Sequence, residues 1–436
     1  MPQLLTLFLS LLLVSCATTA QNSLTLVYSG NLDGELEPCG CSLDADYGGI
    51  SRRTTYVDGL RKESKNLVLI SAGGLFSKEL GGDTIKNRYI LSGLEQLNYD
   101  AIGVQWADLI HGIDFLQQSP LPLTAANWRT DELPSSRIIE RPQQQLFFTQ
   151  WLDPETSPYK NMPALSPINA DTAPLEQQLK QANDNAQLTI LATTLDYQQL
   201  KQNIDLAAVD IVIIKSAYEQ FSEPVEADGT LILQAGSRGQ RLGKLQLSIN
   251  AQGNLDSWSH EVIELHNEIA DTPRLQSWYE AYNEELRTAF ESEIKQMRAL
   301  DQGETPYAGE QVCASCHQQA HDVWAGSEHA KAYEDLEIVG KAFDSHCVGC
   351  HVVGFKQPGG FLSIELTSTL AGVQCENCHG AGREHVQSAG VKQTPNHGMN
   401  KEQICTQCHI QEHSPNFQTD EYWPKILHSK EQSAQQ

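Results

Sequence analysis

The sequence predicts an α/β domain on the N-terminal side, joined to a C-terminal domain of clearly different composition. Short β-branched apolar runs alternate with helical patterns through the first part, which is typical of layered strands and helices. By contrast, 11 of the 14 histidines and eight of the 11 cysteines lie from residue 313 onward. At 436 residues, the chain is long enough for two or three domains.

Five apolar runs in the N-terminal part predict buried strands. They are residues 24–28, 67–70, 188–192, 209–214 and 231–233. A helical pattern lies between two of them, at residues 85–97. The stretch 130–173 is rich in Pro, Gln and Ser, so we expect it to be irregular. The α/β domain should extend over residues 22–265.

A helical connector is predicted at residues 271–300, followed by a hinge into the C-terminal domain. Asp271 and Thr272 precede Pro273, which is a favourable start for a helix. Apolar residues then recur at spacings of three and four, as on one face of an amphipathic helix. They are Leu275, Trp278, Tyr282, Leu286, Phe290, Ile294 and Met297. Packing against a domain is the simplest interpretation, and a partner-binding helix is the alternative.

The first residues have the features of an export signal. An apolar run at 4–14 is too short to span a bilayer and is followed by small residues. Residues 13–16, Leu-Val-Ser-Cys, resemble a bacterial lipobox, in which Cys16 becomes the lipidated N-terminus. We therefore predict a lipoprotein signal peptide at 1–16, with Ala17 favouring the outer membrane. The alternative is an ordinary signal peptide cleaved near Ala17 or Ala20.

The charge of the chain excludes some classes of partner. The formal net charge is -25, whereas nucleic-acid-binding proteins present basic surfaces. An acidic protein is also poorly suited to loose docking on anionic lipid. We expect no nucleic-acid partner, and the charge is compatible with a basic protein partner.

Four copies of one motif dominate the C-terminal part. In each, two cysteines are separated by two residues and followed at once by a histidine. Two thiols at this spacing can add to the two vinyl groups of one haem, and the histidine then becomes the proximal iron ligand. Zinc and thiol redox sites also use paired cysteines, but they need no histidine at a fixed place. The motifs predict four covalently bound c-type haems. They are Cys313/Cys316/His317, Cys347/Cys350/His351, Cys375/Cys378/His379 and Cys405/Cys408/His409.

Seven further histidines could supply ligands on the opposite face of each iron. Their concentration in this part of the chain predicts mostly bis-histidine, low-spin haems, which suit electron transfer. For any single one of them, an ordinary surface position is the alternative. The seven are His321, His329, His346, His385, His397, His413 and His428.

The C-terminal region resembles the tetrahaem cytochrome c-554 family. The similarity is carried by Tyr-Ala-Gly at 307–309, Trp-Ala-Gly-Ser-Glu-His-Ala at 324–330, and the motif segments 347–355 and 372–382. The resemblance implies a mostly helical domain at 305–415, wrapped around closely packed haems, with a tail at 416–436. It also implies multi-electron relay between periplasmic redox partners. By position, it assigns the distal ligands to His329, His385 and His397.

The same family can have one five-coordinate haem, bound by its second motif. His346 directly precedes Cys347 and departs from the family pattern, so the ligation of that haem stays open. The expected function is therefore a membrane-anchored electron carrier. The alternative is a haem enzyme that reduces a small nitrogen oxide at one five-coordinate iron.

The N-terminal region resembles the calcineurin-like metallophosphatases, in the branch that includes 5'-nucleotidases. The similar segments are 31–37, 48–53, 71–74, 101–103, 125–127, 234–236 and 242–245. The family holds two metal ions with Asp and His ligands that clamp a phosphate. The resemblance implies a metallophosphatase-like sandwich.

The metal ligands of that family are largely replaced. Asn31 and Asp33 stand in place of Asp-x-His, and Gly73-Gly74 in place of Gly-Asp. Gly103-Val104-Gln105 replaces Gly-Asn-His, and residues 215–218 replace the late Gly-His-x-His. We therefore expect a degenerate site in a docking or spacer module. Residual hydrolase chemistry is a weaker alternative.

Cys39 and Cys41 form a Cys-Gly-Cys pair outside these motifs. A disulfide between residues this close would be strained. Two structural thiols are the simplest interpretation, and a metal or redox role is the alternative.

Overall fold

In the computed structural model, the chain forms two compact units, each with most of its contacts within itself. One unit comprises Met1–Leu36, Gly48–Gly82 and Ile90–Ile269, and the other comprises Glu37–Tyr47, Asp83–Tyr89 and Ala270–Gln436. The described residues are 22–39, 46–77, 84–129, 131–142, 144–214, 223–250, 252–300, 303–410, 414 and 416–428. The predicted signal peptide with Cys16, and the side chains of Cys39 and Cys41, lie outside the described parts. No helix in this described portion is long and apolar enough to cross a membrane.

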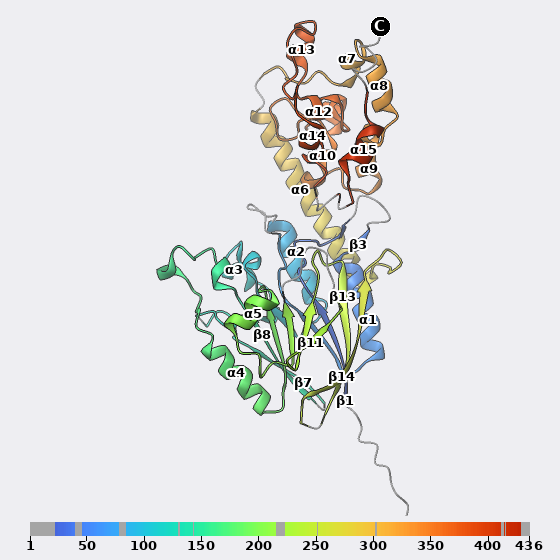
Figure 1. The fold of residues 1–436 in the computed structure, drawn as a ribbon. Helices are drawn as coiled ribbons and strands as arrows, with labels where there is room; N and C mark the ends of the chain where they lie inside the picture. The colour runs from blue at the N-terminus through green and yellow to red at the C-terminus, as the bar shows by residue number, and fades with distance from the viewer. Residues whose placement is uncertain are drawn as a thin grey trace, which may run out of the picture. The chain divides into compact units, whose positions relative to one another are not determined.

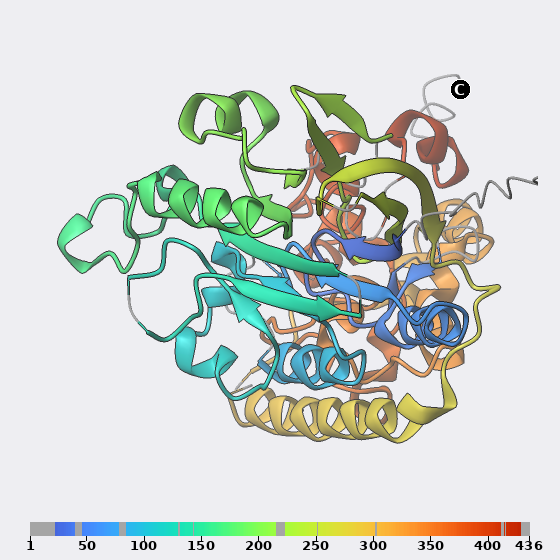
Figure 2. The same cartoon turned by 90° about the horizontal axis from the view of Figure 1, so that it is seen from below.

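The first unit contains two six-stranded sheets (Figures 1 and 2). The strands of one sheet are β1 (Asn22–Ser29), β4 (Leu67–Ser71), β5 (Ala101–Gly103), β6 (Leu123–Thr124), β13 (Arg241–Ile249) and β14 (Leu255–Glu264). Those of the other are β7 (Arg137–Arg141), β8 (Gln144–Trp151), β9 (Leu188–Thr193), β10 (Ile211–Ile214), β11 (Val225–Ala227) and β12 (Thr230–Gln234). Their orders are β14-β13-β1-β4-β5-β6 and β11-β12-β10-β9-β8-β7. The strands β2 (Pro38–Cys39) and β3 (Tyr47–Gly48) form a separate short pair.

The main core of this unit lies between the two sheets. Leu26 and Ile70 from the first sheet share one buried cluster with Phe148 and Ile190 from the second, and all four are fully excluded from solvent. Burial of each such side chain contributes roughly 1.5–3 kcal/mol. A second cluster packs α4 (Ala173–Asp184) and α5 (Tyr197–Asn203) against the second sheet. The remaining helices are α1 (Ile50–Glu63), α2 (Thr84–Glu95), α3 (Ile113–Leu116), η2 (Trp106–Leu109), η3 (Pro154–Thr156) and η4 (Pro163–Leu165).

All five predicted strands and the predicted helix at 85–97 are confirmed. The prediction that residues 130–173 are irregular is wrong. It contains the antiparallel pair β7 and β8, and β8 also pairs in parallel with β9. Leu146 and Phe148 of β8 are fully buried. The polar glutamines around them obscured a strand whose apolar side chains complete the second sheet.

The second unit is mostly helical, as the sequence predicted. Its long helix α6 (Gln276–Leu300) follows a 3-10 turn, η5 (Pro273–Leu275). The predicted apolar face is confirmed, since α6 buries Tyr282, Leu286, Phe290 and Ile294. Phe290 and Ile294 pack into the core of this same unit. The other elements are α7 (Glu310–Ala314), α8 (Gln318–Ala325), η6 (Glu328–Lys331), α9 (Ala332–Ile338), α10 (Ser345–His351), α11 (Ile364–Thr367), η7 (Ser368–Leu370), α12 (Cys375–His379), α13 (Arg383–Gln387), α14 (Lys401–Cys405), α15 (Thr419–Tyr422) and η8 (Trp423–Lys425).

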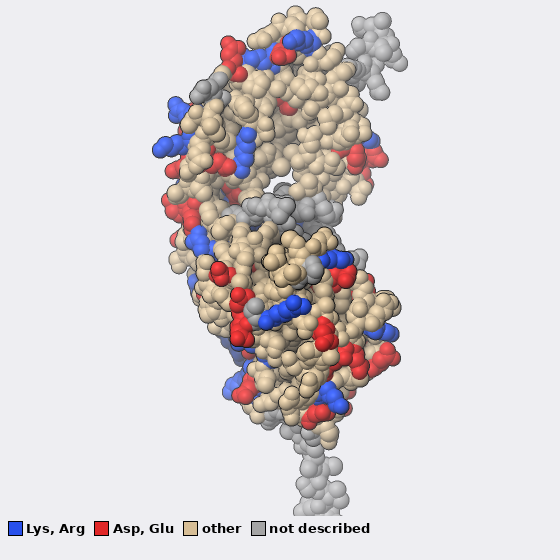
Figure 3. Space-filling model, turned by 90° about the vertical axis from the view of Figure 1, so that its left-hand side faces the viewer, with Lys and Arg blue, Asp and Glu red and all other residues tan. Residues whose placement is uncertain are grey.

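Charged side chains are distributed over the visible surface. Figure 3 shows acidic and basic side chains interspersed with broad uncharged areas on the face drawn. Such mixing is typical of an ordinary solvated protein surface.

Candidate functional site

Each of the four Cys-x-x-Cys-His motifs lies on or at the end of a short helix of the second unit. The second and third motifs fall within α10 and α12, whereas the first and fourth begin in α7 and α14. In the first and fourth, the N–H of His317 and that of His409 each donate at 2.9 Å to the carbonyl of the first cysteine of the motif. One helical turn therefore brings the two thiols and the histidine to the same region. None of these eight cysteines forms a disulfide bond.

Cys316 differs from the other motif cysteines in its exposure. Its side chain is exposed, whereas the other seven are half-buried. The sequence predicts that Cys316 and Cys313 together attach the first haem. A thioether bond in a packed interior would be covered, whereas the Cys316 side chain is exposed. The helices α7 and α8, on either side of Cys316, bury no side chain. Attachment at Cys316 stays a prediction.

The motifs approach one another in two pairs. The thiol of Cys313 in the first motif hydrogen-bonds to Cys375 in the third, which lowers the pKa of Cys375 to about 7 and raises that of Cys313. Cys408 of the fourth motif hydrogen-bonds to Cys350 of the second, which lowers the pKa of Cys350 to about 7 and raises that of Cys408. The first motif is thus adjacent to the third, and the second to the fourth.

Three of the four predicted proximal imidazoles face a second imidazole. Metal–imidazole bonds of about 2 Å on opposite sides of one ion would place the two ring centres about 6 Å apart. Among the described residues, three pairs of imidazole rings have this spacing. The centroid distances are 6.2 Å for His317 and His385, 6.1 Å for His409 and His329, and 5.8 Å for His379 and His428.

Hydrogen bonds select the nitrogen that several of these rings can offer to a metal. Nδ1 of His351, His385 and His428 lies 2.6, 2.7 and 3.0 Å, respectively, from a backbone carbonyl oxygen. Because a carbonyl oxygen only accepts, Nδ1 carries the proton and Nε2 keeps its lone pair. Burial lowers the pKa of His329 and of His409, with a smaller effect of the neighbouring His351 on His329 and of His329 on His409. Both rings are therefore neutral near pH 7, which is the form that ligates.

The second motif differs from the other three. His351 belongs to no ring pair among the described residues, although it is the imidazole neighbour that lowers the pKa of His329. His413 lies outside the described residues. The backbone N–H of His346 donates to Oδ1 of Asp344 at 3.0 Å, at the start of α10.

The structure separates the predicted distal ligands. His329 and His385 each face a proximal ring, whereas the exposed His397 is part of no ring pair in the described part of the chain. The position opposite His379 is held by His428, in the segment that the sequence assigned to a tail. Nε2 of His321 lies 2.5 Å from Oε2 of Glu310 and so has a carboxylate partner.

These residues fit covalently bound haem. Among the described residues after Leu370, no hydrophobic side chain is buried, although the segment forms α12, α13, α14 and α15. A planar apolar group attached to the cysteines would supply the core that these side chains do not. In the described portion, no three His, Cys, Asp or Glu side chains cluster as direct metal ligands, so the thiols are not arranged as a zinc tetrad.

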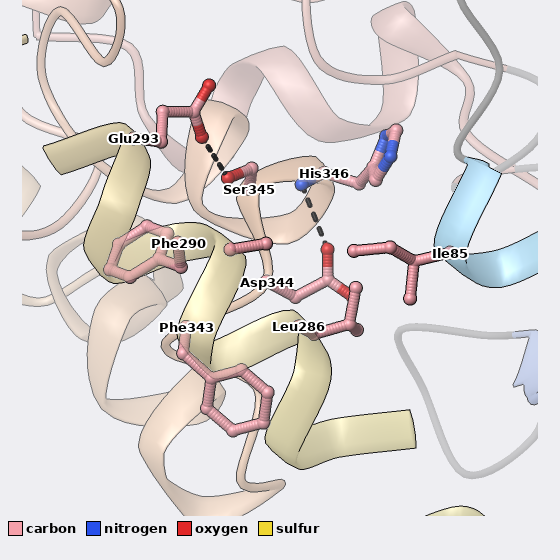
Figure 4. Close-up of a pocket in the computed structure, with 9 residues that line it drawn as sticks. Ile85, Leu286, Phe290, Glu293, Phe343, Asp344, Ser345 and His346 are labelled. Carbon is pink, nitrogen blue, oxygen red and sulfur yellow. Dashed lines mark hydrogen bonds between the residues drawn. The ribbon is translucent and has the colours of Figure 1, made fainter. Parts of the chain in front are cut away.

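A pocket of about 280 Å³ lies beside the second motif (Figure 4). One of its carboxylates, Glu293, accepts from Ser345 Oγ at 2.5 Å and pairs with Lys356 Nζ at 2.9 Å. Phe290 belongs to the same core cluster as Cys347, so the pocket wall continues to the haem attachment point. The lining residues are Ile85, Leu286, Ala289, Phe290, Glu293, Phe343, Asp344, Ser345 and His346.

In the first unit, the loops after β1, β4 and β5 meet at one edge of the sheet, because these strands are parallel. This is where the family metal ligands are replaced. Nδ2 of Asn31 donates to Oδ1 of Asp33 at 3.2 Å, and Nε2 of Gln105 donates to Oδ1 of Asn31 at 2.8 Å. Gly74 has a φ of 70°, and a Cβ there would lie 2.5 Å from the Asn31 side chain. An amide network with no room for a carboxylate at position 74 therefore takes the place of the ligand set.

Asp108 is a buried carboxylate next to this network that sequence reasoning missed. It accepts hydrogen bonds from the N–H groups of Gly74 at 2.9 Å, Leu75 at 2.5 Å and Gln105 at 2.8 Å. Burial raises its pKa to about 6, and the backbone hydrogen bonds oppose this shift. Its position three residues after Gln105, in a capping box, was the available sequence signal.

Comparison with known sequences supports the two-part division. Residues 312–380 match the family model Cytochrome c554 and c-prime. Cytochrome c-554 of Nitrosomonas europaea is 35% identical over 138 residues, covering 24% of this chain and 59% of that protein. Snake venom 5'-nucleotidase of Naja atra is 24% identical over 116 residues, covering 24% of this chain and 22% of that protein. The chain therefore spans less than two thirds of the length of either relative.

Comparison with solved structures concerns the fold. The sulfate thiohydrolase SoxB of Thermus thermophilus, in complex with glycerol, matches with a TM-score of 0.50 and 13% identity, covering 59% of this chain and 60% of that one. A 5'-nucleotidase precursor of Thermus thermophilus matches with a TM-score of 0.49 and 15% identity, covering 80% and 74%. The C-terminal region thus resembles the cytochrome c-554 family, and the mixed α/β sheets resemble the metallophosphatase and 5'-nucleotidase fold. Both expectations from the sequence are confirmed.

Proposed function

We propose that this chain is a membrane-anchored c-type cytochrome that carries four haems and transfers electrons between redox partners in the periplasm or at the outer membrane. The observation that carries the proposal is the set of three imidazole pairs with ring centres about 6 Å apart. Two histidine ligands leave the iron no open position, which suits electron transfer better than ligand chemistry.

Different residues of the second unit attach the haems, ligate the irons and orient the ligands. The haems, when bound, supply one-electron redox chemistry. The eight motif cysteines, the exposed Cys316 included, attach them, and the hydrogen bonds from Nδ1 orient the imidazoles. In this assignment His428 replaces His397 as a distal ligand. The proposed proximal and distal pairs are His317 with His385, His379 with His428, and His409 with His329.

A second candidate function is reduction of a small nitrogen oxide at the second motif. It is favoured by His351, which forms no ring pair within the described residues and whose Nδ1 is engaged by a carbonyl oxygen at 2.6 Å. An iron with one histidine ligand keeps a position open for a small molecule.

The deciding experiment is a haem count followed by optical and EPR spectra of the mature protein, before and after addition of nitric oxide. The proposed function requires four covalent haems, of which three are low-spin and bis-histidine ligated. A fourth low-spin haem with no response to nitric oxide supports the pure carrier. A high-spin haem that shifts on ligand addition supports the second candidate. Absence of covalent haem contradicts both.

We also propose that the first unit is a docking or spacer module without phosphatase activity, exported and anchored through Cys16. The support is the amide network at Asn31 and Gln105, and the lipobox in the sequence. Hydrolysis of a chromogenic phosphate by the purified protein with added Mn²⁺ would contradict the first point. Retention of Cys16→Ala in the membrane fraction would contradict the second.

A further inference from the structure

Glu376 is a buried carboxylate between the two cysteines of the third motif. Its side chain reaches the segment just before the first motif and accepts from the N–H of Ala308 at 2.9 and 3.1 Å and from that of Gly309 at 2.9 Å. It also accepts from the N–H of Gly382 at 2.6 Å. The residue is only 5% exposed. One carboxylate thus ties the first motif to the third.

The groups that contact the Glu376 carboxylate are uncharged backbone N–H dipoles and not positively charged side chains. None of the ion pairs within the described residues involves it, and its hydrogen bonds come from backbone N–H groups. Its negative charge is felt at both neighbouring attachment points. Glu376 directly follows Cys375, and the N–H groups that it accepts from Ala308 and Gly309 lie five and four residues before Cys313. Glu376 is therefore a common electrostatic neighbour of two motifs.

We propose that Glu376 lowers the reduction potentials of the haems attached by the first and third motifs relative to the other two. The inference rests on the proposed function and assigns a direction within it. Adding an electron to an iron removes one positive charge, so a nearby anion disfavours the reduced form. The effect is strong only where solvent does not screen it, and burial of Glu376 meets that condition. Glu376 acts as a positioning residue that also sets the potential, without touching iron.

Potentiometric titration of Glu376→Gln tests this proposal. Glutamine keeps the size of the side chain and removes the charge. We expect the one-electron reduction equilibrium of two haems to shift about tenfold towards the reduced form, which is about 59 mV upward. The other two haems should keep their potentials. EPR at poised potentials assigns which low-spin signals move.

Two variants serve as controls. Glu376→Asp keeps the charge, so its potentials should lie close to those of the unmodified protein. Glu402→Gln removes an exposed carboxylate that lies on α14 near Cys405, and solvent screening should keep that shift much smaller. Equal shifts in Glu376→Gln and Glu376→Asp would show that packing, and not charge, is responsible.

The unmodified protein provides an independent check if Glu376→Gln does not fold. Its first and third haems must be the pair with the lower potentials, and the reverse order overturns the inference. A protein with four haems whose potentials do not respond to Glu376→Gln also overturns it, while leaving electron transfer intact. Loss of the proposed function itself would be recognised earlier, as absence of covalent haem.

Discussion

The two units of this protein are stabilised in opposite ways. The first unit buries a side-chain core between two sheets, including Leu26 and Phe148. In the second unit, side-chain burial is concentrated around α6, α9 and the second motif, and no hydrophobic residue described after Leu370 is buried. One unit therefore has a core made of its own residues, whereas the described residues in the later part of the other form no such apolar core.

This difference bears on how well each unit tolerates changes at its site. A fold that is held by its own core can lose metal ligands such as those replaced by Asn31 and Gln105 and still fold. A segment whose core is the cofactor cannot lose Cys or His without losing structure as well. The second unit is therefore expected to retain complete motifs.

The largest effect on this contrast between the two units is expected from removal of one haem attachment motif. Cys375→Ala with Cys378→Ala should reduce the haem count by one, because both thioether bonds of the third motif are lost. We expect the segment after Leu370 to become sensitive to protease, since its described residues bury no hydrophobic side chain. Pyridine haemochrome analysis and limited proteolysis measure the two effects.

The matched control for this double substitution is Ser315→Ala, which changes an exposed residue inside the first motif. It should leave the haem count and the protease pattern unchanged. Unaltered protease resistance in the double variant would mean that the segment has stability of its own, and the contrast between the units would fail.

A smaller effect is expected from Asp108→Asn in the first unit. Asparagine cannot accept all the N–H groups that Asp108 holds, so at least one buried donor loses its partner. Each such donor costs about 1–3 kcal/mol. Urea unfolding followed by tryptophan fluorescence should show this loss at pH 7, above the raised pKa of Asp108, with the haem spectrum unchanged. Asp114→Asn, on the exposed side of α3, is the control.

The same carboxylate predicts a pH dependence. The pKa of Asp108 is raised to about 6 by burial, so the folded state binds a proton more tightly than the unfolded state does. Its contribution to stability is fully present below the unfolded pKa of about 3.9 and is lost as pH rises through about 6. This decline should be absent in Asp108→Asn. An equal pH profile in both proteins would argue against the buried carboxylate as its source.

The smallest structural change is expected from single distal histidines. His428→Ala should convert one low-spin haem to high-spin, because it removes the ring that faces His379. His397→Ala should leave the EPR spectrum unchanged, since its ring is exposed and faces no proximal histidine in the described part of the chain. Secondary structure should be kept in both variants. The opposite pattern would restore the ligand set predicted from the sequence.

Much of the fold was predictable, and the errors have physical causes. Runs of β-branched residues such as 67–70 identified central strands, because buried parallel strands are apolar on both faces. β8 was missed because glutamines flank its apolar residues, and its burial comes from pairing with β9. Asp108 was missed because its importance comes from N–H groups after β4, more than 30 residues earlier in the chain.

The sequence by itself determined the chemistry of the C-terminal part, because each motif is five consecutive residues arranged by one helical turn. It also determined the loss of the metal ligands, since those positions follow strands that can be recognised locally. Only the tertiary structure decided which histidine faces which motif, which motifs are neighbours, and where Glu376 reaches. Those relations join segments far apart in the chain, and their distances depend on packing that no local pattern encodes.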